Sequence, residues 1–214
     1  MGVVMKTRLI SPTEVDPVQA AAFLERDFNQ CFTQMRRYEE LIWDICKFTF
    51  TGYTAILGVA IGLYRFSIES KTDLTPSAVA VLAVGFLIGL CMFFLIVRNR
   101  VYFVHVTRYV NEHRAHFLRG NPLGFQNRSG MYTDITQPPY FRWNSSQMIV
   151  AYVVAFLNSI LVAALIYILG PPSTATLAVS MASLLLLAGF QLVPAILFLE
   201  HLESKEKDLE KTHG

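Results

Sequence analysis

The sequence lacks the residue patterns that mark most enzymes and most disulfide-stabilised proteins. Its three cysteines have no paired spacing, which argues against a disulfide framework and against a thiolate metal site. It has no glycine-rich phosphate loop, no metal-ligand spacing and no Ser-His-Asp or Cys-His arrangement. We therefore predict a protein that is not an enzyme, with no catalytic residues, no metal and no cofactor.

Charged residues are absent from four long apolar stretches, which cover residues 48–64, 75–97, 144–176 and 177–199. A membrane-spanning helix needs about 20 mostly apolar residues, whereas core helices of soluble proteins rarely run that far without a charge. The sequence therefore predicts an all-α fold with four transmembrane helices. Because no Asp, Glu, Lys or Arg lies at mid-membrane, we do not expect a proton-coupled transporter or a pump.

Positive charge is concentrated on one side of these stretches. Of the eighteen Lys and Arg residues, sixteen lie in the N-terminal arm, in the segment 98–142 and in the tail after residue 199. The positive-inside rule then places both termini and the middle segment in the cytoplasm. We expect no signal peptide, because the N-terminal arm lacks the apolar core that a signal needs. The predicted divisions are 1–46 (cytoplasmic arm and stalk helix), 47–97 (spans one and two), 98–143 (basic cytoplasmic helix and loop), 144–199 (spans three and four) and 200–214 (charged cytoplasmic tail).

Two heptad seams extend the first two spans beyond the membrane. The first follows a helix start at Asp16 and Pro17, and it consists of Leu24, Phe28, Cys31, Met35, Tyr38, Ile42 and Ile45. The second consists of Phe103, Val106, Val110, His113 and Phe117. We expect one helix over residues 17–64, packed against the second extension as an antiparallel cytoplasmic stalk. One hairpin cannot cover all the apolar surface of both extensions, so we predict a homo-oligomer.

Small and weakly polar residues form a stripe on the first span, at Thr51, Thr54, Gly58 and Gly62. The stripe fits either a pore lining or helix packing inside one subunit, and the sequence leaves both interpretations open. Gly85 and Gly89 repeat the small-xxx-small pattern on the second span. Asn158 and Gln191 are the most polar residues deep in their spans. We expect them to form interhelical hydrogen bonds in preference to a permeation site.

The segment 98–143 carries seven arginines against Glu112 and Asp134, a net charge of +5. We expect Arg98 and Arg100 at the membrane edge. An aromatic belt is expected beside them, at Tyr140, Phe141 and Trp143. Arginines farther along the helix lie too far from the lipid headgroups to be explained by lipid attraction. We predict that they bind an anionic ligand, either a nucleotide or an oligonucleotide. The candidate ligand residues are Arg108, His113, Arg114, His116, Arg119 and Arg128.

The same helix twice contains the Arg-x4-His pattern of HEPN ribonucleases. Arg108 and His113 fit it, and so do Arg100 and His105. The stronger form of the motif has a polar residue directly after the arginine, where this chain has tyrosine and valine. We therefore favour a basic helix that meets lipid headgroups or an anionic ligand, with a membrane-bound nuclease as a weaker alternative.

The run Arg108 to Leu118 (RYVNEHRAHFL), on a pair of stalk-forming spans, resembles small bacterial membrane proteins that assemble as rings. These are the RipA-like octameric membrane proteins and the membrane accessory protein of type VI-B CRISPR systems. The four-span layout is also similar to channel effectors of anti-phage operons, such as the oligonucleotide-gated channel of the Hailong system. The resemblance covers residues 17–120. It implies a homo-oligomeric pore in the bacterial inner membrane that a cytosolic signal opens during infection. The alternative is a non-conducting membrane scaffold whose stalk docks a cytosolic defence enzyme.

Overall fold

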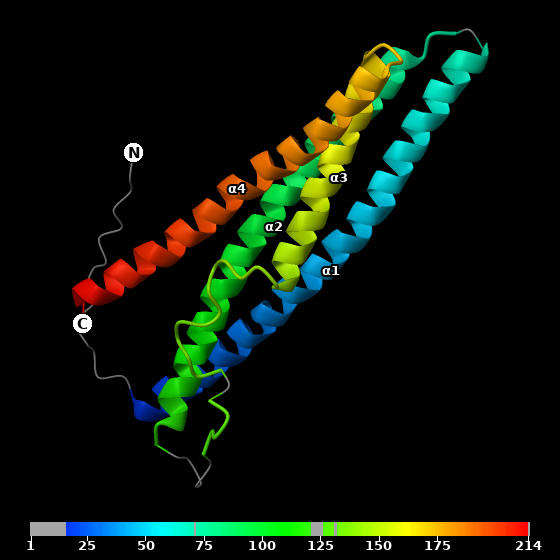
Figure 1. Ribbon diagram of the computed structural model, residues 1–214. Coiled ribbons are helices and arrows are strands. Elements are labelled where there is room, and N and C mark those ends of the chain that lie inside the picture. Colours follow the sequence, from blue (N-terminus) through cyan, green and yellow to red (C-terminus); the bar gives the residue numbers. More distant parts are fainter. Residues whose placement is uncertain (1–15, 71, 121–125, 131, 214) are drawn as a thin grey trace, which may run out of the picture.

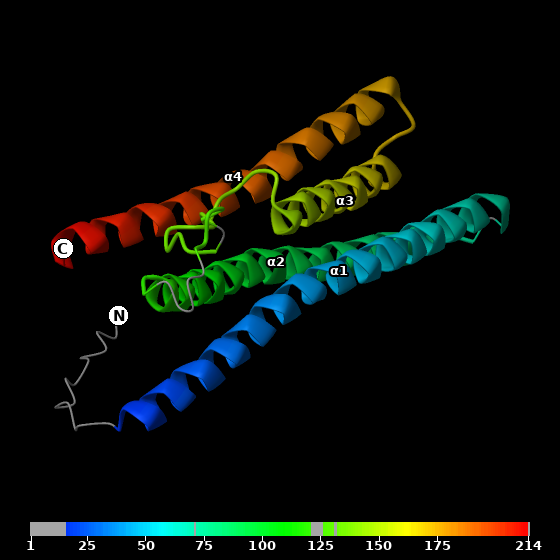
Figure 2. The same ribbon diagram turned by 90° about the horizontal axis from the view of Figure 1, so that it is seen from below.

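The computed structural model describes residues 16–70, 72–120, 126–130 and 132–213. Four helices account for most of them: α1 (Pro17–Ser70), α2 (Thr75–Leu118), α3 (Ser146–Leu169) and α4 (Thr174–His213). Each helix is long and apolar enough to cross a membrane, which confirms the all-α fold and the four candidate spans. Consecutive helices pack against one another, and α1 also contacts α3. Figure 2 shows α2 between α1 and α3, with α4 on the outer side of α3.

The helices alternate in direction, so the chain connections divide between two ends of the bundle. The two short connections, between α1 and α2 and between α3 and α4, lie at one end (Figure 1). The start of α1, the end of α2, the described residues of 126–145 and the end of α4 lie toward the other, which we call the charged end. Most lysines and arginines of the chain belong to the charged end.

Helix α1 begins where the sequence predicts and ends later than predicted. The Asp16 carboxylate accepts a hydrogen bond from the Val18 N–H at 3.2 Å, which caps the first turn. The predicted end at residue 64 is wrong, because α1 continues to Ser70. An ion pair between Arg65 and Glu69 at 3.8 Å spans one turn of this extension, and the Ser70 hydroxyl bonds back to the Phe66 carbonyl at 2.7 Å.

The first seam faces α2. All seven of its residues are partly or fully buried, whereas Arg36, Arg37 and Glu40 on other faces of α1 are exposed. The Tyr38 ring stacks on Tyr102 at a centroid distance of 6.1 Å, and the Asn99 amide donates to the Tyr38 carbonyl at 3.0 Å. The predicted antiparallel packing of the two extensions is therefore present within one chain.

The last helix is longer than the sequence suggests. The sequence predicts a short charged helix in the tail after residue 199, and in the structure this segment is the end of α4, which runs without interruption to His213. Ion pairs one turn apart support this part of the helix, with Lys207 3.6 Å from Glu203 and Lys211 3.9 Å from Asp208.

The core of the bundle is apolar, and so is much of its outside. Small side chains such as Ala151 and Ala155 on α3 are fully buried and let α3 approach its neighbours closely. Large apolar side chains such as Leu186 and Phe190 on α4 are mostly exposed. A soluble protein rarely leaves such continuous apolar surface in contact with water, so this surface is suited to lipid or to other helices.

Candidate functional site

A buried cluster of polar side chains from α1, α3 and α4 lies in the apolar part of the bundle. Helix α2 has a glycine at the point where it passes this cluster. The Tyr53 hydroxyl of α1 donates to the Asn158 side-chain carbonyl of α3, and the Asn158 amide donates to Gln191 Oε1 of α4 at 2.8 Å. A Cβ atom at Gly89 of α2 would collide with both Tyr53 and Asn158. Asn158 and Gln191 therefore make the interhelical hydrogen bonds that the sequence predicts. Both side chains are buried, although Gln191 also borders a hollow of about 990 Å³ between α2 and α4.

The small-residue stripe of α1 lies on the outside. Thr51, Thr54, Gly58 and Gly62 are all exposed, and a Cβ atom at either glycine would meet no other atom within 4 Å. The Thr54 hydroxyl bonds to the Phe50 carbonyl of its own helix at 2.8 Å. Helix packing inside one subunit, which was one interpretation of this stripe, is therefore wrong. The face is open to lipid, to water or to another subunit.

At the charged end, Arg108 is fully engaged with other residues of the chain. Its guanidinium forms ion pairs with Glu203, at 2.7 Å, and with Glu206 of α4, and its Nε donates to the Pro138 carbonyl at 3.1 Å. Only 13% of the Arg108 side chain is exposed. The guanidinium also lies 4.7 Å from the centre of the Tyr140 ring. Arg108 therefore ties α2, the 126–145 connection and α4 together, and its charge is already neutralised.

The acidic partners of Arg108 are held by the same connection. The Tyr140 N–H donates to Glu203 Oε2 at 3.0 Å, and the Tyr140 hydroxyl donates to Glu206 Oε1 at 2.6 Å. Burial raises the pKa of Glu203, but the Tyr140 N–H and the Arg108 guanidinium outweigh it and hold that pKa below its usual range. Tyr140 is buried, so the predicted place for it in an exposed aromatic belt is wrong. Trp143, in contrast, is 73% exposed.

His113 is buried between α1 and α2. Its ring lies 6.3 Å from Phe28 and 4.5 Å from Tyr109, and its Nε2 is 3.9 Å from Asp27 Oδ2. The Tyr109 hydroxyl donates to the same Asp27 oxygen at 2.7 Å, and this hydrogen bond, aided by burial, raises the pKa of Tyr109 to about 12. Arg108 and His113 thus have partners on different helices, Arg108 on α4 and His113 on α1.

The remaining predicted ligand residues lie toward the tip of α2. Arg119 and Arg128 line one hollow of about 590 Å³, together with Leu118, Gln126 and Thr133. The Arg114 guanidinium lies 5.5 Å from the centre of the Tyr132 ring, and His116 is exposed. Of the six predicted residues, the structure brings only Arg119 and Arg128 together in one hollow.

The sequence predicts Arg100 at the membrane edge but does not predict that its side chain is buried. Arg100 is 2% exposed and donates to three uncharged acceptors of the connection and α3. The signal for its burial was present, because Arg100 continues the buried stripe of Ile96 and Val104 at four-residue spacing.

No protein-family model, no curated protein and no solved structure matches this chain.

Proposed function

We propose that this chain is a homo-oligomeric pore of the bacterial inner membrane, opened from the cytoplasmic side by an anionic ligand. The observation that carries the proposal is the open stripe of Thr51, Thr54, Gly58 and Gly62. Small residues permit close approach of another helix, and threonine hydroxyls tolerate water. A copy of the same subunit is the partner that would place this stripe around a common axis.

The ligand site in this proposal is the hollow between Arg119 and Arg128. Within the described residues, neither side chain lies within 4.0 Å of a carboxylate oxygen, in contrast to Arg108. A nucleotide or oligonucleotide would supply phosphates for the guanidinium groups. Repetition of the hollow around a ring would concentrate the positive potential.

Helix continuity supplies the mechanical link between hollow and pore. Helix α2 runs from Thr75 to Leu118, which at 1.5 Å per residue is about 66 Å. Its tip borders the hollow, and its apolar part packs on α1, which carries the stripe. A ligand that prefers one arrangement of the α2 tips would shift the populations of closed and open pores.

Conductance across a planar bilayer tests the pore. We expect purified wild-type protein to conduct, and Gly58→Leu to lose conductance because leucine would fill the stripe. Gly189→Leu is the matched control, because a Cβ atom at Gly189 of α4 also meets nothing within 4 Å. Wild-type protein that forms oligomers without conducting would instead favour the non-conducting scaffold. The exposed Phe23 and Trp43 of α1 would suit such a docking role.

Ligand gating needs a separate test. Arg119→Ala with Arg128→Ala should abolish nucleotide-dependent or oligonucleotide-dependent conductance and leave spontaneous openings unchanged. Arg26→Ala with Arg37→Ala removes the same charge from exposed positions of α1 and is the control. A double variant of the hollow that gates like wild type would place the ligand site elsewhere.

A further inference from the structure

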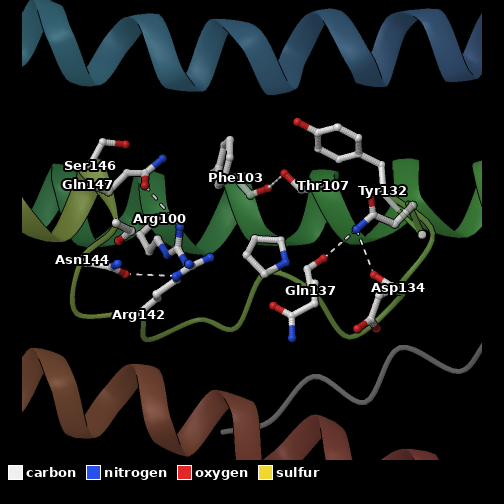
Figure 3. Close-up of a pocket in the computed structure, with 14 residues that line it drawn as sticks. Arg100, Phe103, Thr107, Tyr132, Asp134, Gln137, Arg142, Asn144, Ser146 and Gln147 are labelled. Atoms are coloured by element: carbon white, nitrogen blue, oxygen red, sulfur yellow. Dashed lines mark hydrogen bonds between the residues drawn. The ribbon is translucent and has the colours of Figure 1, made fainter. Parts of the chain in front are cut away.

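A second basic site lies nearer the apolar part of the bundle, in a pocket of about 510 Å³ between α2, the 126–145 connection and the start of α3. Figure 3 shows Arg100, Arg142, Asn144, Ser146 and Gln147 gathered at one end of this pocket. None of these residues belongs to the hollow of Arg119 and Arg128. The pocket is therefore a separate candidate for a ligand.

Arg100 is a buried charge without a charged partner. Its Nε donates to the Tyr140 carbonyl at 2.9 Å, one Nη donates to the Pro139 carbonyl at 2.5 Å, and the other donates to Gln147 Oε1 at 3.2 Å. Among the described residues, no carboxylate oxygen lies within 4.0 Å of its guanidinium, whereas Arg108 on the same helix has two. Buried charges in proteins are normally paired, so this end of the pocket has an uncompensated positive charge.

Arg142 adds a second positive charge beside the first. Its Nε donates to Asn144 Oδ1 at 3.0 Å, and its side chain is exposed at the pocket (Figure 3). Burial, with further contributions from Arg142 and Arg108, lowers the pKa of Arg100 to about 10. Arg100 thus remains protonated at pH 7, and two like charges are held close together. An anion between them would remove this repulsion.

The third component is the first turn of α3. The Ser145 hydroxyl caps this helix by accepting from the Met148 N–H at 3.4 Å. The Ser145 N–H itself donates to the Arg142 carbonyl at 3.0 Å, so two of the four N–H groups that a helix start leaves without helical partners are satisfied by these residues. Ser146 and Gln147, the first residues of α3, line the pocket beside the two arginines. The partial positive charge of the helix start therefore adds to theirs.

The acidic residue of the pocket lies at its other end. Asp134 accepts from the Thr136 N–H at 2.9 Å and from the Thr136 hydroxyl at 2.6 Å, and these hydrogen bonds lower the pKa of Asp134. In Figure 3, Tyr132 and Asp134 lie at the end of the pocket opposite Arg100 and Arg142. The Asn111 amide donates to the Asp134 and Gln137 carbonyls, at 2.9 and 2.8 Å, and fixes this part of the connection to α2.

We propose that Arg100, Arg142 and the first turn of α3 form a binding site for a phosphate group. The two arginines and the first residues of α3 line the same end of the pocket, and a tetrahedral oxyanion offers acceptors in several directions at once. The phosphate can belong to an anionic phospholipid headgroup or to a soluble phosphate compound, because both present the same chemistry. The site does not depend on the proposed pore, since it lies within one chain.

Two binding measurements on the intact protein distinguish these sources. In the first, melting temperature in detergent is followed against inorganic phosphate, with chloride at matched ionic strength as reference. In the second, the protein is released from nanodiscs of phosphatidylcholine and phosphatidylglycerol, and retained lipids are counted by native mass spectrometry. Stabilisation by phosphate supports a soluble ligand, and selective retention of phosphatidylglycerol supports a lipid headgroup. If neither occurs with wild-type protein, the proposal is wrong.

Variants then assign the binding to the site. Arg142→Gln should weaken the binding of whichever probe is bound by about tenfold, because it removes a charge-assisted contact. Arg142→Lys keeps the positive charge but loses the paired N–H donors of the guanidinium group. Its binding affinity should lie between those of Arg142→Gln and the wild type. Arg142 is exposed, and its side chain is hydrogen-bonded to Asn144 on the surface, so Arg142→Gln should not lower the melting temperature without ligand; relief of the repulsion with Arg100 should leave it equal or raise it.

Two control variants should not weaken the binding of either probe. Arg26→Gln removes the same charge from an exposed arginine of α1 that does not line the pocket, and it should change binding less than twofold. Asp134→Asn removes the negative charge from the far end, so binding should be unchanged or tighter. A loss from either control as large as that from Arg142→Gln would overturn the site in favour of diffuse electrostatic attraction.

Discussion

Two pairs of glycines with the same spacing lie on opposite kinds of surface. Gly85 and Gly89 of α2 are buried, and a Cβ atom at Gly85 would approach Ile56 Cγ2 to 2.8 Å. Gly58 and Gly62 of α1 are exposed, with nothing within 4 Å of either Cβ position. The small-xxx-small pattern indicates that another helix can approach closely, but it does not indicate whether that helix belongs to the same chain. The buried pair is used within the chain, and the open pair is free for contacts outside it.

The largest effect is expected at Gly89, where the buried pair meets the polar cluster. Gly89→Ala would push a methyl group against the Tyr53 hydroxyl and the Asn158 amide, so the hydrogen bond between them would have to break or shift. We expect a loss of about 3 kcal/mol of unfolding free energy, from overpacking together with the lost hydrogen bond. Unfolding in mixed micelles of mild detergent and SDS measures it. A variant as stable as wild type would mean that α2 does not approach the cluster.

Removal of the polar cluster itself should lower the unfolding free energy by less than Gly89→Ala does. Asn158→Leu leaves the Tyr53 hydroxyl and the Gln191 amide without their partner, although leucine keeps much of the volume. Interhelical hydrogen bonds in membranes contribute modestly, so we expect about 1–2 kcal/mol in the same assay. Pairing Asn158→Leu with Gly89→Ala should give less than the sum, because both act on one cluster. Full additivity would contradict a shared cluster.

Gly85 should be more tolerant than its neighbour. The nearest atoms to its Cβ position are side-chain methyl groups of Ile56 and Leu161, which can rotate away. Alanine also has the higher helix propensity, which offsets part of the clash. We expect Gly85→Ala to lower the unfolding free energy by about 1 kcal/mol. A loss greater than that of Gly89→Ala would show that apolar packing governs this contact more than the polar cluster.

The four helices could be predicted from the sequence, but the different environments of the two glycine pairs could not. Absence of charge over long stretches is enough to predict spans, because lipid excludes unpaired charge regardless of tertiary contacts. The seam from Leu24 to Ile45 was also readable, because burial against one partner imposes a helical period. Gly58 and Gly85 have the same local pattern, and they are distinguished only by the tertiary packing, which places α1 and α3 against Gly85 and no helix of the chain against Gly58.

The hydrogen-bond partners of Arg100 were not predicted for a related reason. Its partners are the Tyr140 and Pro139 carbonyls and the Gln147 amide, about 40 or more residues away in the chain. The spacing of Ile96, Arg100 and Val104 indicates that Arg100 lies on a buried face. Any residue type can supply a backbone carbonyl, so the sequence does not predict which acceptors Arg100 finds there. The Arg108 ion pairs across α2 and α4 depend likewise on how far α4 continues beyond its apolar part.

The smallest effect on the single chain, and the most informative, is expected at the open pair. Gly58→Ala with Gly62→Ala places two methyl groups in empty space, so the unfolding free energy of a subunit should stay the same or rise by up to about 1 kcal/mol per site through helix propensity. If a second subunit lies against this face, the same methyl groups separate the two backbones, and the assembly measured by light scattering should become smaller or dissociate at higher protein concentration. Gly189→Ala on α4 should leave the assembly unchanged, because it adds a methyl group that also meets no atom within 4 Å, at a position outside the stripe. An assembly that is indifferent to both glycines of α1 would mean that the open face meets only lipid, and the contrast between the two pairs would then be one of burial without a role in subunit contact.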